Sequence, residues 1–495
     1  MRIKLSQTLR SMLKRHLAHL WRTPFLKAHC CRSKTPSHRR SSHREGESAS
    51  MATQRRRRRR GDKPKSKAAP RRQPPPGPTD VHDVPDHLLD LIFLRLHSSA
   101  CLLRAAATCT RWRRVVADAG FLSRFRSLHP PCIAGHYHAV DPDWADYRSS
   151  SPPITDTPVF LPSSSLTADS RRFSLDFLPH SDSGWNLADG RGSLLLLFKK
   201  RTGWAARARS RCLSDLVVCE PPTRRCQGIL CPRDLGGVLL GVFLLGGDRN
   251  DGSGGRIVGM SSFRVVAVLH DYHTSEPGRG MPVACVFSPG SDGGWRFLPS
   301  ASASTDGDVS LPDAVDSITF AGRANGSLYW VIGEDGAMLA LDEATVEFSR
   351  VQVLADGMWE SNVDRWSFRV VGGEDGAPRV VRLVSNELKV FARLPGGDEW
   401  VVEKLVRLPE ATRGLPGRKE HWYFRRNAMI VAAHDAYILV TPQEKTWLFS
   451  VELETMEVER RHERNRYPGA AFPCELPWPP ALEACADHGR RRRCR

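Results

Sequence analysis

Several patterns are missing from this sequence. No pair of its 13 cysteines has the Cys-x-x-Cys spacing of structural zinc sites and redox motifs. No apolar run reaches the roughly 18 residues that cross a bilayer, because the longest, residues 235–245, is short and interrupted by glycines. We therefore expect no metal site, no membrane partner, and thiols kept reduced in the nucleus, the cytoplasm or both.

Signatures of catalysis are missing as well. The sequence has no G-x-x-x-x-G-K-[ST] phosphate loop, no H-E-x-x-H zinc helix and no G-x-S-x-G nucleophile elbow. Its glycine clusters lack the strand-then-helix setting of a dinucleotide site and are typical of turns. The segment 270–273, His-Asp-Tyr-His, favours an exposed polar turn over a metal site. We expect no catalysis by this chain and no cofactor.

Acidic residues are scarce in the first part of the chain. Residues 1–79 hold 23 lysines and arginines against three acids, so of the formal charge of +19 the remaining residues carry a net charge of −1. A nucleic-acid-binding domain would carry its basic residues on the folded surface. The charge distribution therefore makes nucleic acid an unlikely partner, although a nuclear nucleic-acid-associated protein using the basic arm is the alternative hypothesis.

The basic segment contains two patterns. Residues 1–44 have no acid, and apolar residues recur at near-helical spacing up to Pro24, which resembles an organelle transit peptide. Alternatively, Met51 is the true start and residues 1–50 are an extension of the gene model, which we favour. Six arginines at 55–60 begin a basic, proline-rich stretch that predicts a disordered linker, either an import signal or phosphate-binding arm or simply a charged tail. We expect disorder over 1–79 and a basic tail over 483–495.

A helical segment is predicted over residues 80–127. Pro85 suits a first helical turn, and Asp83 and Asp86 place negative charge at the positive end of the helix dipole. Residues 100–109 favour a second helix, and residues 111–122 a third. Helices this short need apolar packing on each other or on a partner.

The motifs of this segment resemble the F-box of plant F-box proteins. They read Val-Pro-Asp-x-Leu-Leu-x-x-Ile-x-x-Arg-Leu over 84–96, Leu-x-x-Ala-x-x-Cys over 103–109, and Cys-x-Arg-Trp-Arg over 109–113. Val84 replaces the family's usual leucine, which should weaken docking only modestly.

The resemblance implies a helical hairpin that inserts apolar side chains into a groove on a Skp-type adaptor, which a cullin scaffold holds. By position in the motif, the residues expected to make this contact or to shape it are Val84, Pro85, Leu88, Leu89, Ile92, Leu96, Cys109 and Trp112. Trp112 is the expected energetic anchor. The competing interpretation is that these residues form the internal core of an ordinary helical cap.

The rest of the chain, residues 150–482, predicts an all-β domain. Short β-branched or aromatic runs alternate with turn residues, as in 194–198, 216–219 and 263–269. Five segments repeat a strand, an acidic or proline-containing turn and a second strand, and their last apolar residues are 230, 298, 354, 408 and 458. Such spacing approaches that of propeller blades, about 40–50 residues.

The predicted fold is thus α+β and multidomain, with a small three-helix F-box before a complete or degenerate β-propeller. A two-sheet sandwich is the alternative. Asn325 to Trp330, followed by Ala340 to Asp342, also resembles the β domain behind the F-box in many plant proteins.

The function that the resemblance implies is that of a substrate-recognition subunit of a cullin-type (SCF) ubiquitin ligase, with an unknown protein substrate on the β domain. Aromatic and charged loop residues such as Trp204, His270 and Trp366 are more simply interpreted as packing residues, so none is assigned to a site.

Overall fold

The structure, a computed structural model, describes residues 84–477 except for 130, 140–157, 164–169, 180–183, 200–214, 233–236, 247–257, 272–278, 291–293, 299–308, 313, 333–335, 353–365, 374–375, 395–396, 398, 416–423, 425–426, 443–447 and 463–469. The predicted leader, 1–79, and the predicted tail, 483–495, lie outside the described residues.

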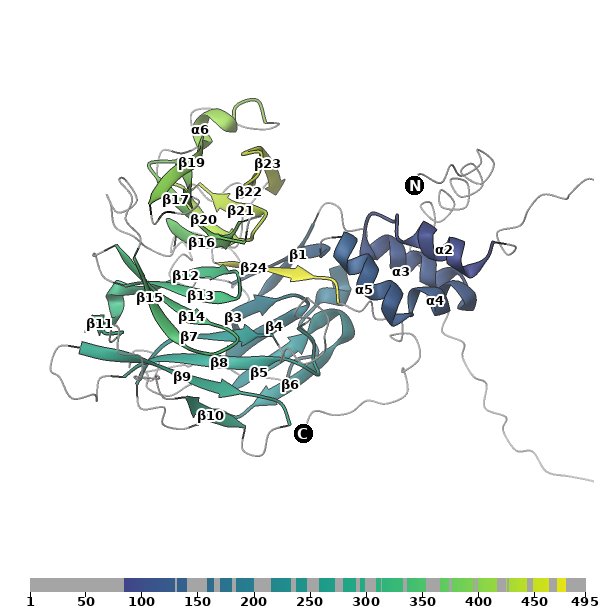
Figure 1. The fold of residues 1–495 in the computed structure, drawn as a ribbon, viewed down its shortest axis with the longest axis horizontal. Coiled ribbons are helices and arrows are strands. Elements are labelled where there is room, and N and C mark those ends of the chain that lie inside the picture. Colours follow the sequence, from purple (N-terminus) through teal and green to yellow (C-terminus); the bar gives the residue numbers. More distant parts are fainter. Residues whose placement is uncertain are drawn as a thin grey trace, which may run out of the picture. The chain divides into compact units, whose positions relative to one another are not determined.

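Short helices open the described part of the chain: α2 (Asp86–Phe93), α3 (Ser99–Thr108), α4 (Thr110–Val116) and α5 (Ala119–Leu128) (Figure 1). Ser98, Cys109 and Asp118 cap the last three, each side chain accepting a hydrogen bond from the backbone N–H three residues later. The structure differs from the prediction at 111–122, expected as one helix. Asp118 begins a new helix there, because its carboxylate accepts from Phe121 N at 2.8 Å.

The β domain begins at Ile133, earlier than the predicted residue 150, and its strands form successive antiparallel sheets. One joins β1 (Ile133–His138) to β2 (Val159–Pro162) and β24 (Ala471–Glu475). The others run in chain order: β3 (Trp185–Arg191), β4 (Leu194–Lys199), β5 (Leu216–Glu220), β6 (Arg225–Ile229); β7 (Val238–Leu245), β8 (Arg264–Asp271), β9 (Arg279–Phe287), β10 (Trp295–Leu298); β12 (Ile318–Ala324), β13 (Ser327–Ile332), β14 (Ala337–Asp342), β15 (Phe348–Gln352); β16 (Phe368–Gly372), β17 (Pro378–Val384), β18 (Glu387–Arg393), β19 (Trp400–Arg407); and β20 (Met429–Ala433), β21 (Tyr437–Thr441), β22 (Leu448–Glu452), β23 (Val458–His462).

Shorter elements complete the described chain. The two-residue strand β11 (Leu311–Pro312) pairs with the start of β9. A short helix, α6 (Leu408–Ala411), follows β19, and single 3₁₀ turns lie at Ser170–Phe173, Pro221–Thr223 and Val315–Ser317.

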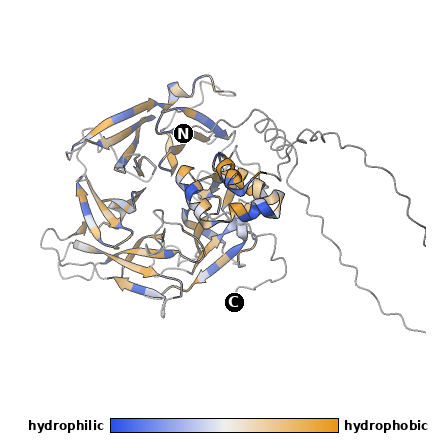
Figure 2. Cartoon of the chain, turned by 45° about the vertical axis from the view of Figure 1, so that its right-hand side comes forward, coloured by the Kyte–Doolittle hydropathy of each residue, from blue (hydrophilic) through white to orange (hydrophobic). Residues whose placement is uncertain are grey.

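The sheets form a closed ring. One strand of each sheet or half-sheet contacts its counterparts on both sides, in the cyclic order β24, β3, β7, β12, β16, β20 and back to β24. Figure 2 shows the sheets arranged around a common centre. The ring closes because β24, from the end of the domain, pairs with β1, from its beginning. Among the described residues the strands form five hydrogen-bonded sheets, of which the largest consists of two four-stranded halves, β12–β15 and β16–β19, joined by β12 and β16. The six groups of strands that result surround the ring as the blades of a β-propeller do, which excludes the sandwich alternative.

Buried clusters fill the space between each pair of neighbouring sheets. One, for example, joins Leu196 and Val218 to Val242 and Val265, and another closes the ring by joining Leu439 and Leu448 to Ala471. Strands enclosed on both faces have little alternation of apolar and polar residues. All five residues of β5 are buried, for instance.

One glycine marks a close approach between two sheets. Gly322 of β12 lies beside Val370 of β16, the parallel pair that joins their sheets, and has a φ of 149°. A Cβ at Gly322 would lie 2.2 Å from the Val370 carbonyl oxygen. No residue other than glycine fits this conformation and this spacing.

The predicted repeat corresponds to the outer strands everywhere except in the sheet of β1, β2 and β24. Its five segments fall on the strand pairs β5–β6, β9–β10, β14–β15, β18–β19 and β22–β23. Three of the turns share one design, in which an acid is followed by a threonine that contacts it and then by a residue with positive φ. These trios are Glu220, Thr223 and Arg224; Asp342, Thr345 and Val346; and Glu452, Thr455 and Met456.

Candidate functional site

Helix α2 begins directly after Pro85. Leu88 N and Leu89 N both donate to the Pro85 carbonyl oxygen, at 3.0 and 3.1 Å, so Pro85 immediately precedes the first helical residue. Asp86, the first residue of α2, stands at the positive end of the helix dipole. Pro85 therefore fixes the start of the helix and with it the direction of the apolar side chains that follow.

Helix α2 carries apolar side chains on two sides. Leu89 and Phe93 are buried, whereas Leu88 and Ile92 are half-buried and Leu91 is 42% exposed. At 3.6 residues per turn, the last three share one side of the helix. We name this side, Leu88, Leu91 and Ile92, the open face of α2.

The sequence interpretation missed Leu91. The F-box comparison singled out Leu88, Leu89 and Ile92, and the position between them was treated as unspecified. A signal was nevertheless available, because Leu91 follows Leu88 by three residues and so must lie beside it on a helix.

Trp112 lies in the interior of the helical segment. It is 5% exposed, and its ring meets that of Phe93 edge to face, with centroids 5.1 Å apart. Of the other expected contact residues, Cys109 caps α4 through its sulfur, which accepts from Trp112 N at 3.5 Å. Leu89 and Trp112 thus occupy positions that shape the helical core, while Val84, Pro85, Leu88, Ile92 and Leu96 keep part of their surface exposed. Adaptor contact by any of them stays a prediction.

Polar contacts tie the C-terminal half of α2 to α5. The Arg124 guanidinium donates to both carboxylate oxygens of Asp90, at 2.8 and 3.0 Å. His129 Nε2 donates to the Leu94 carbonyl oxygen at 2.8 Å, and its ring lies tilted against that of Phe125, with centroids 4.2 Å apart. These contacts fix the direction of the helix relative to α5.

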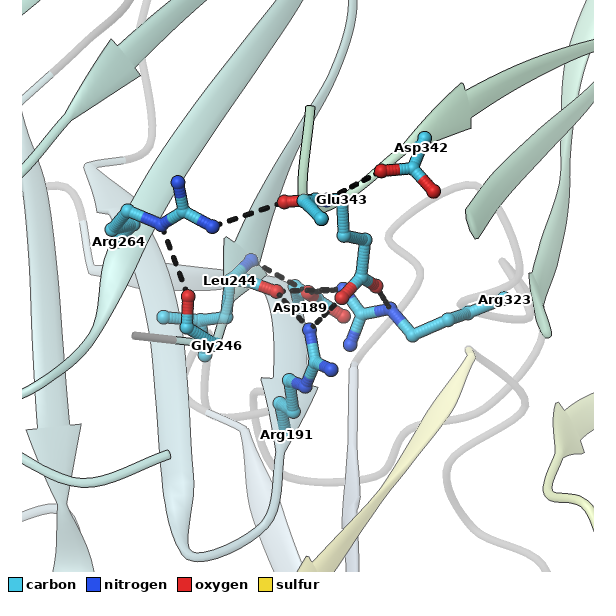
Figure 3. A network of polar contacts seen from close by, with 9 residues as sticks. Asp189, Arg191, Leu244, Gly246, Arg264, Arg323, Asp342 and Glu343 are labelled. Atoms are coloured by element: carbon cyan, nitrogen blue, oxygen red, sulfur yellow. Dashed lines mark hydrogen bonds and ion pairs between the residues drawn. The ribbon is translucent and has the colours of Figure 1, made fainter. Parts of the chain in front are cut away.

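The ring contains a buried polar network that joins three sheets (Figure 3). Glu343, fully buried after β14, accepts from Arg191 of β3 at 2.6 Å and pairs with Arg323 of β12 at 2.9 Å. Arg323 also donates to Asp189 of β3 at 2.9 Å and to the Leu244 carbonyl oxygen at 2.8 Å. Leu244 N in turn donates to the Asp189 carboxylate at 2.8 Å.

A third arginine extends the network through hydrogen bonds to the backbone. Arg264 donates to the backbone carbonyl oxygens of Gly246 and Glu343, at 3.0 Å each. It therefore fixes the turn that carries Glu343, so that the carboxylate points at the other two arginines (Figure 3).

The network shifts the pKa values of its two ion-paired arginines in opposite directions. Burial lowers the pKa of Arg191, and the positive charge of Arg323 lowers it further, against the opposing effect of Glu343. Burial also lowers the pKa of Arg323, but the carboxylates of Asp189 and Glu343 outweigh it and raise the pKa above its ordinary value. Both carboxylates are engaged by arginines from other strands, so the network acts as a clamp between sheets.

Other candidate chemistry is limited. His270 does not lie in an exposed turn as predicted: it is buried at the end of β8, where Nε2 donates to the Pro312 carbonyl oxygen at 3.0 Å. That prediction was wrong because β8 extends through Asp271, while residues 272 and 273 lie outside the described residues. Trp366 is half-buried and packs beside Leu439 and Leu448. Trp204 lies outside the described residues.

In the described ranges no group of three or more histidine, cysteine, aspartate or glutamate side chains could hold a metal ion, and no helix is long and apolar enough to span a bilayer. The described cysteines are free thiols, and burial raises the pKa of Cys231 and Cys285 to about 12.

Comparison with known proteins identifies the helical segment. The F-box-like family model matches residues 81–129. No curated protein matches the chain. Similar solved structures include a protein from Lactobacillus plantarum (11% identical, covering 56% of this chain and 70% of that one, TM-score 0.30), the β-propeller domain of Cps50 (Swd1) from Myceliophteria thermophila (10%, 55% and 69%, 0.27) and apo AztD from Citrobacter koseri (13%, 57% and 61%, 0.24). These likenesses carry no argument about function. The chain thus carries an F-box-like domain at residues 81–129, followed by a β-propeller-like domain.

Proposed function

We propose that this chain is the substrate-recognition subunit of a cullin-type (SCF) ubiquitin ligase. Its F-box-like domain docks a Skp-type adaptor, a cullin scaffold holds the adaptor, and the β domain presents a protein substrate in the nucleus, the cytoplasm or both. The chain itself performs no chemistry: it raises the effective concentration of the substrate beside a ubiquitin carrier.

The observation that carries the proposal is the open face of α2. One side of the helix buries Leu89 and Phe93, and the opposite side leaves Leu88, Leu91 and Ile92 in contact with water. Apolar side chains grouped on one exposed helix face are typical of a helix that binds in a groove of another protein. The match of residues 81–129 to the F-box-like family supports a Skp-type adaptor as that protein.

The test is copurification of an endogenous Skp-type adaptor with the tagged full chain. Leu88→Asp combined with Leu91→Asp places two charges on the open face without touching the buried side. We expect at least a tenfold loss of recovered adaptor, since a charge buried without a partner costs several kcal/mol. Leu128→Asp is the matched control, because Leu128 is 62% exposed at the end of α5 and off the open face.

Helical content and thermal melting of each variant are measured alongside. Equal recovery of adaptor by the wild type and the double variant would reject the proposal. The alternative, a nucleic-acid-associated protein, predicts instead that recovery of adaptor is absent in every variant and that the chain copurifies with nucleic acid through residues 1–79.

A further inference from the structure

The outer strand β10 has an unpaired backbone edge and exposed apolar side chains. It pairs with β9 alone in its sheet, so within the described residues its outer backbone edge has no partner strand. Phe297 is 52% exposed and Leu298 36%, although they point to opposite faces of the strand. An apolar strand with an unpaired edge is a template on which another strand can pair.

Trp295 joins β10 to the end of β6 in the neighbouring sheet. Its indole N–H donates to the Leu230 carbonyl oxygen at 2.9 Å, and its ring packs on Phe287. Leu230, directly after β6, is 83% exposed. The start of β10 therefore lies beside the end of β6, and both strands carry exposed apolar side chains there. We call Arg225–Leu230 together with Trp295–Leu298 the β6–β10 edge.

The charge of this edge has one sign. Its charged residues are Arg225 and Arg296, both exposed, and it contains no carboxylate. Arg225 stands opposite Glu220, but that carboxylate is engaged by the hydroxyl groups of Ser193 and Thr223. Among the described residues, no ion pair neutralises Arg225 or Arg296.

Another outer strand, β19, has charged side chains that are neutralised by ion pairs. Strand β19 also exposes Val402 and Leu405. Its charges are paired, however: Glu403 with Arg379 at 2.9 Å, Lys404 with Glu454 at 3.3 Å and Arg407 with Glu387 at 2.9 Å. Exposed apolar residues thus occur on both edges, and unneutralised positive charge distinguishes the β6–β10 edge.

We propose that the β6–β10 edge binds an extended segment of a partner protein in which acidic and apolar side chains alternate, added as a strand beside β10. Backbone pairing supplies affinity, apolar side chains cover Phe297 and Leu230, and a carboxylate meets Arg296. A second copy of β10 would bring another Arg296 instead of a carboxylate. The chain's own residues 1–79 are strongly basic, so their charge opposes binding here. The proposal does not depend on adaptor binding.

The test uses the full chain and a pooled library of hexapeptides in which Asp or Glu alternates with Val, Leu, Ile or Phe. A matched library carries Lys or Arg at the charged positions. Wild-type protein should enrich acidic peptides, and Arg296→Glu should weaken the best of them at least tenfold and enrich basic peptides instead. Methylating alternate backbone nitrogens of that peptide should abolish binding, because a methylated nitrogen cannot donate to a neighbouring strand.

Val402→Ser is the control on β19 and should leave the affinity unchanged, whereas Phe297→Ser should lower it. Three results would overturn the proposal: no enrichment of acidic over basic peptides by the wild type, equal binding of the best peptide to Arg296→Glu, or a dimer in sedimentation that only Arg296→Glu dissociates. The last result would assign the edge to a second copy of the chain.

Discussion

The ring of sheets and helix α2 bury their apolar residues to different extents. In the ring, each sheet is enclosed by a neighbour on either side, and the first and last strands of the domain, β1 and β24, pair to close it. In α2, Leu89 and Phe93 are buried but Leu91 is not. A closed ring pairs and covers its own strands, whereas α2 leaves apolar side chains exposed. The burial in the ring stabilises the fold, and the exposed side of α2 is the surface that we propose for binding.

Opening the ring should have the largest effect. A chain ending at residue 469 lacks β24, which leaves β1 with one partner and removes the buried Ala471 and Cys474. We expect loss of the cooperative unfolding transition of the β domain in calorimetry, since all the sheets depend on closure. A chain ending at residue 477 keeps β24 and should melt as the full chain does. Equal melting of the two truncated chains would show that the ring does not depend on closure.

Trp112→Ala tests the buried side of the helical segment. Removing a large buried aromatic side chain costs about 3–5 kcal/mol, and the buried Trp112 ring packs against Phe93. We expect loss of helical circular dichroism at a lower temperature, while the melting of the β domain stays unchanged. Leu91→Ser, on the open face, should keep the helical signal. If both variants lose it equally, the two sides of the helix do not differ as described.

Glu343→Ala tests the clamp inside the ring. The change removes a fully buried carboxylate and leaves the half-buried Arg191 and Arg323 with Asp189 alone, and breaking a buried pair from one side costs about 3 kcal/mol. Denaturant unfolding should report this loss. Glu454→Ala removes an exposed partner of Lys404 and should cost less than about 1 kcal/mol. A similar cost for the two variants would mean that the buried network contributes no more than a surface pair.

The sequence was sufficient for the parts of the fold that repeat along the chain. The five predicted segments lie in the outer strand pairs because the two strands of each pair follow one another along the chain, and three of the pairs are joined by a short turn with a local signature, as at Asp342 to Val346. The sheet of β1, β2 and β24 was not predicted, because its strands lie far apart in sequence. No periodicity connects Ile133 to Glu475.

In the candidate sites, too, features with a local sequence signal were predictable and contacts between distant residues were not. The start of α2 was predictable from Pro85, a local signal, and the face of Leu91 could have been predicted from helical spacing. The clamp could not have been predicted from the sequence, because Asp189 and Glu343 are far apart along the chain and are brought together by the closed ring. His270 was placed wrongly because a strand that is buried on both faces tolerates a histidine whose nitrogen finds a backbone acceptor.

The smallest expected effect concerns the acid sensitivity of the ring. Burial lowers the pKa of His434, against the opposing effect of Asp435, and Ala436 N donates to His434 Nδ1 at 3.2 Å, which requires the neutral ring. The unfolded chain binds this proton more readily, so stability should fall as the pH drops below about 6.5. His434→Asn retains an acceptor for Ala436 N but does not titrate. Between pH 7.5 and pH 5.5 it should lose less stability than the wild type in urea unfolding, by under about 1 kcal/mol. Identical pH dependence in the two proteins would place the acid sensitivity of the ring at other residues.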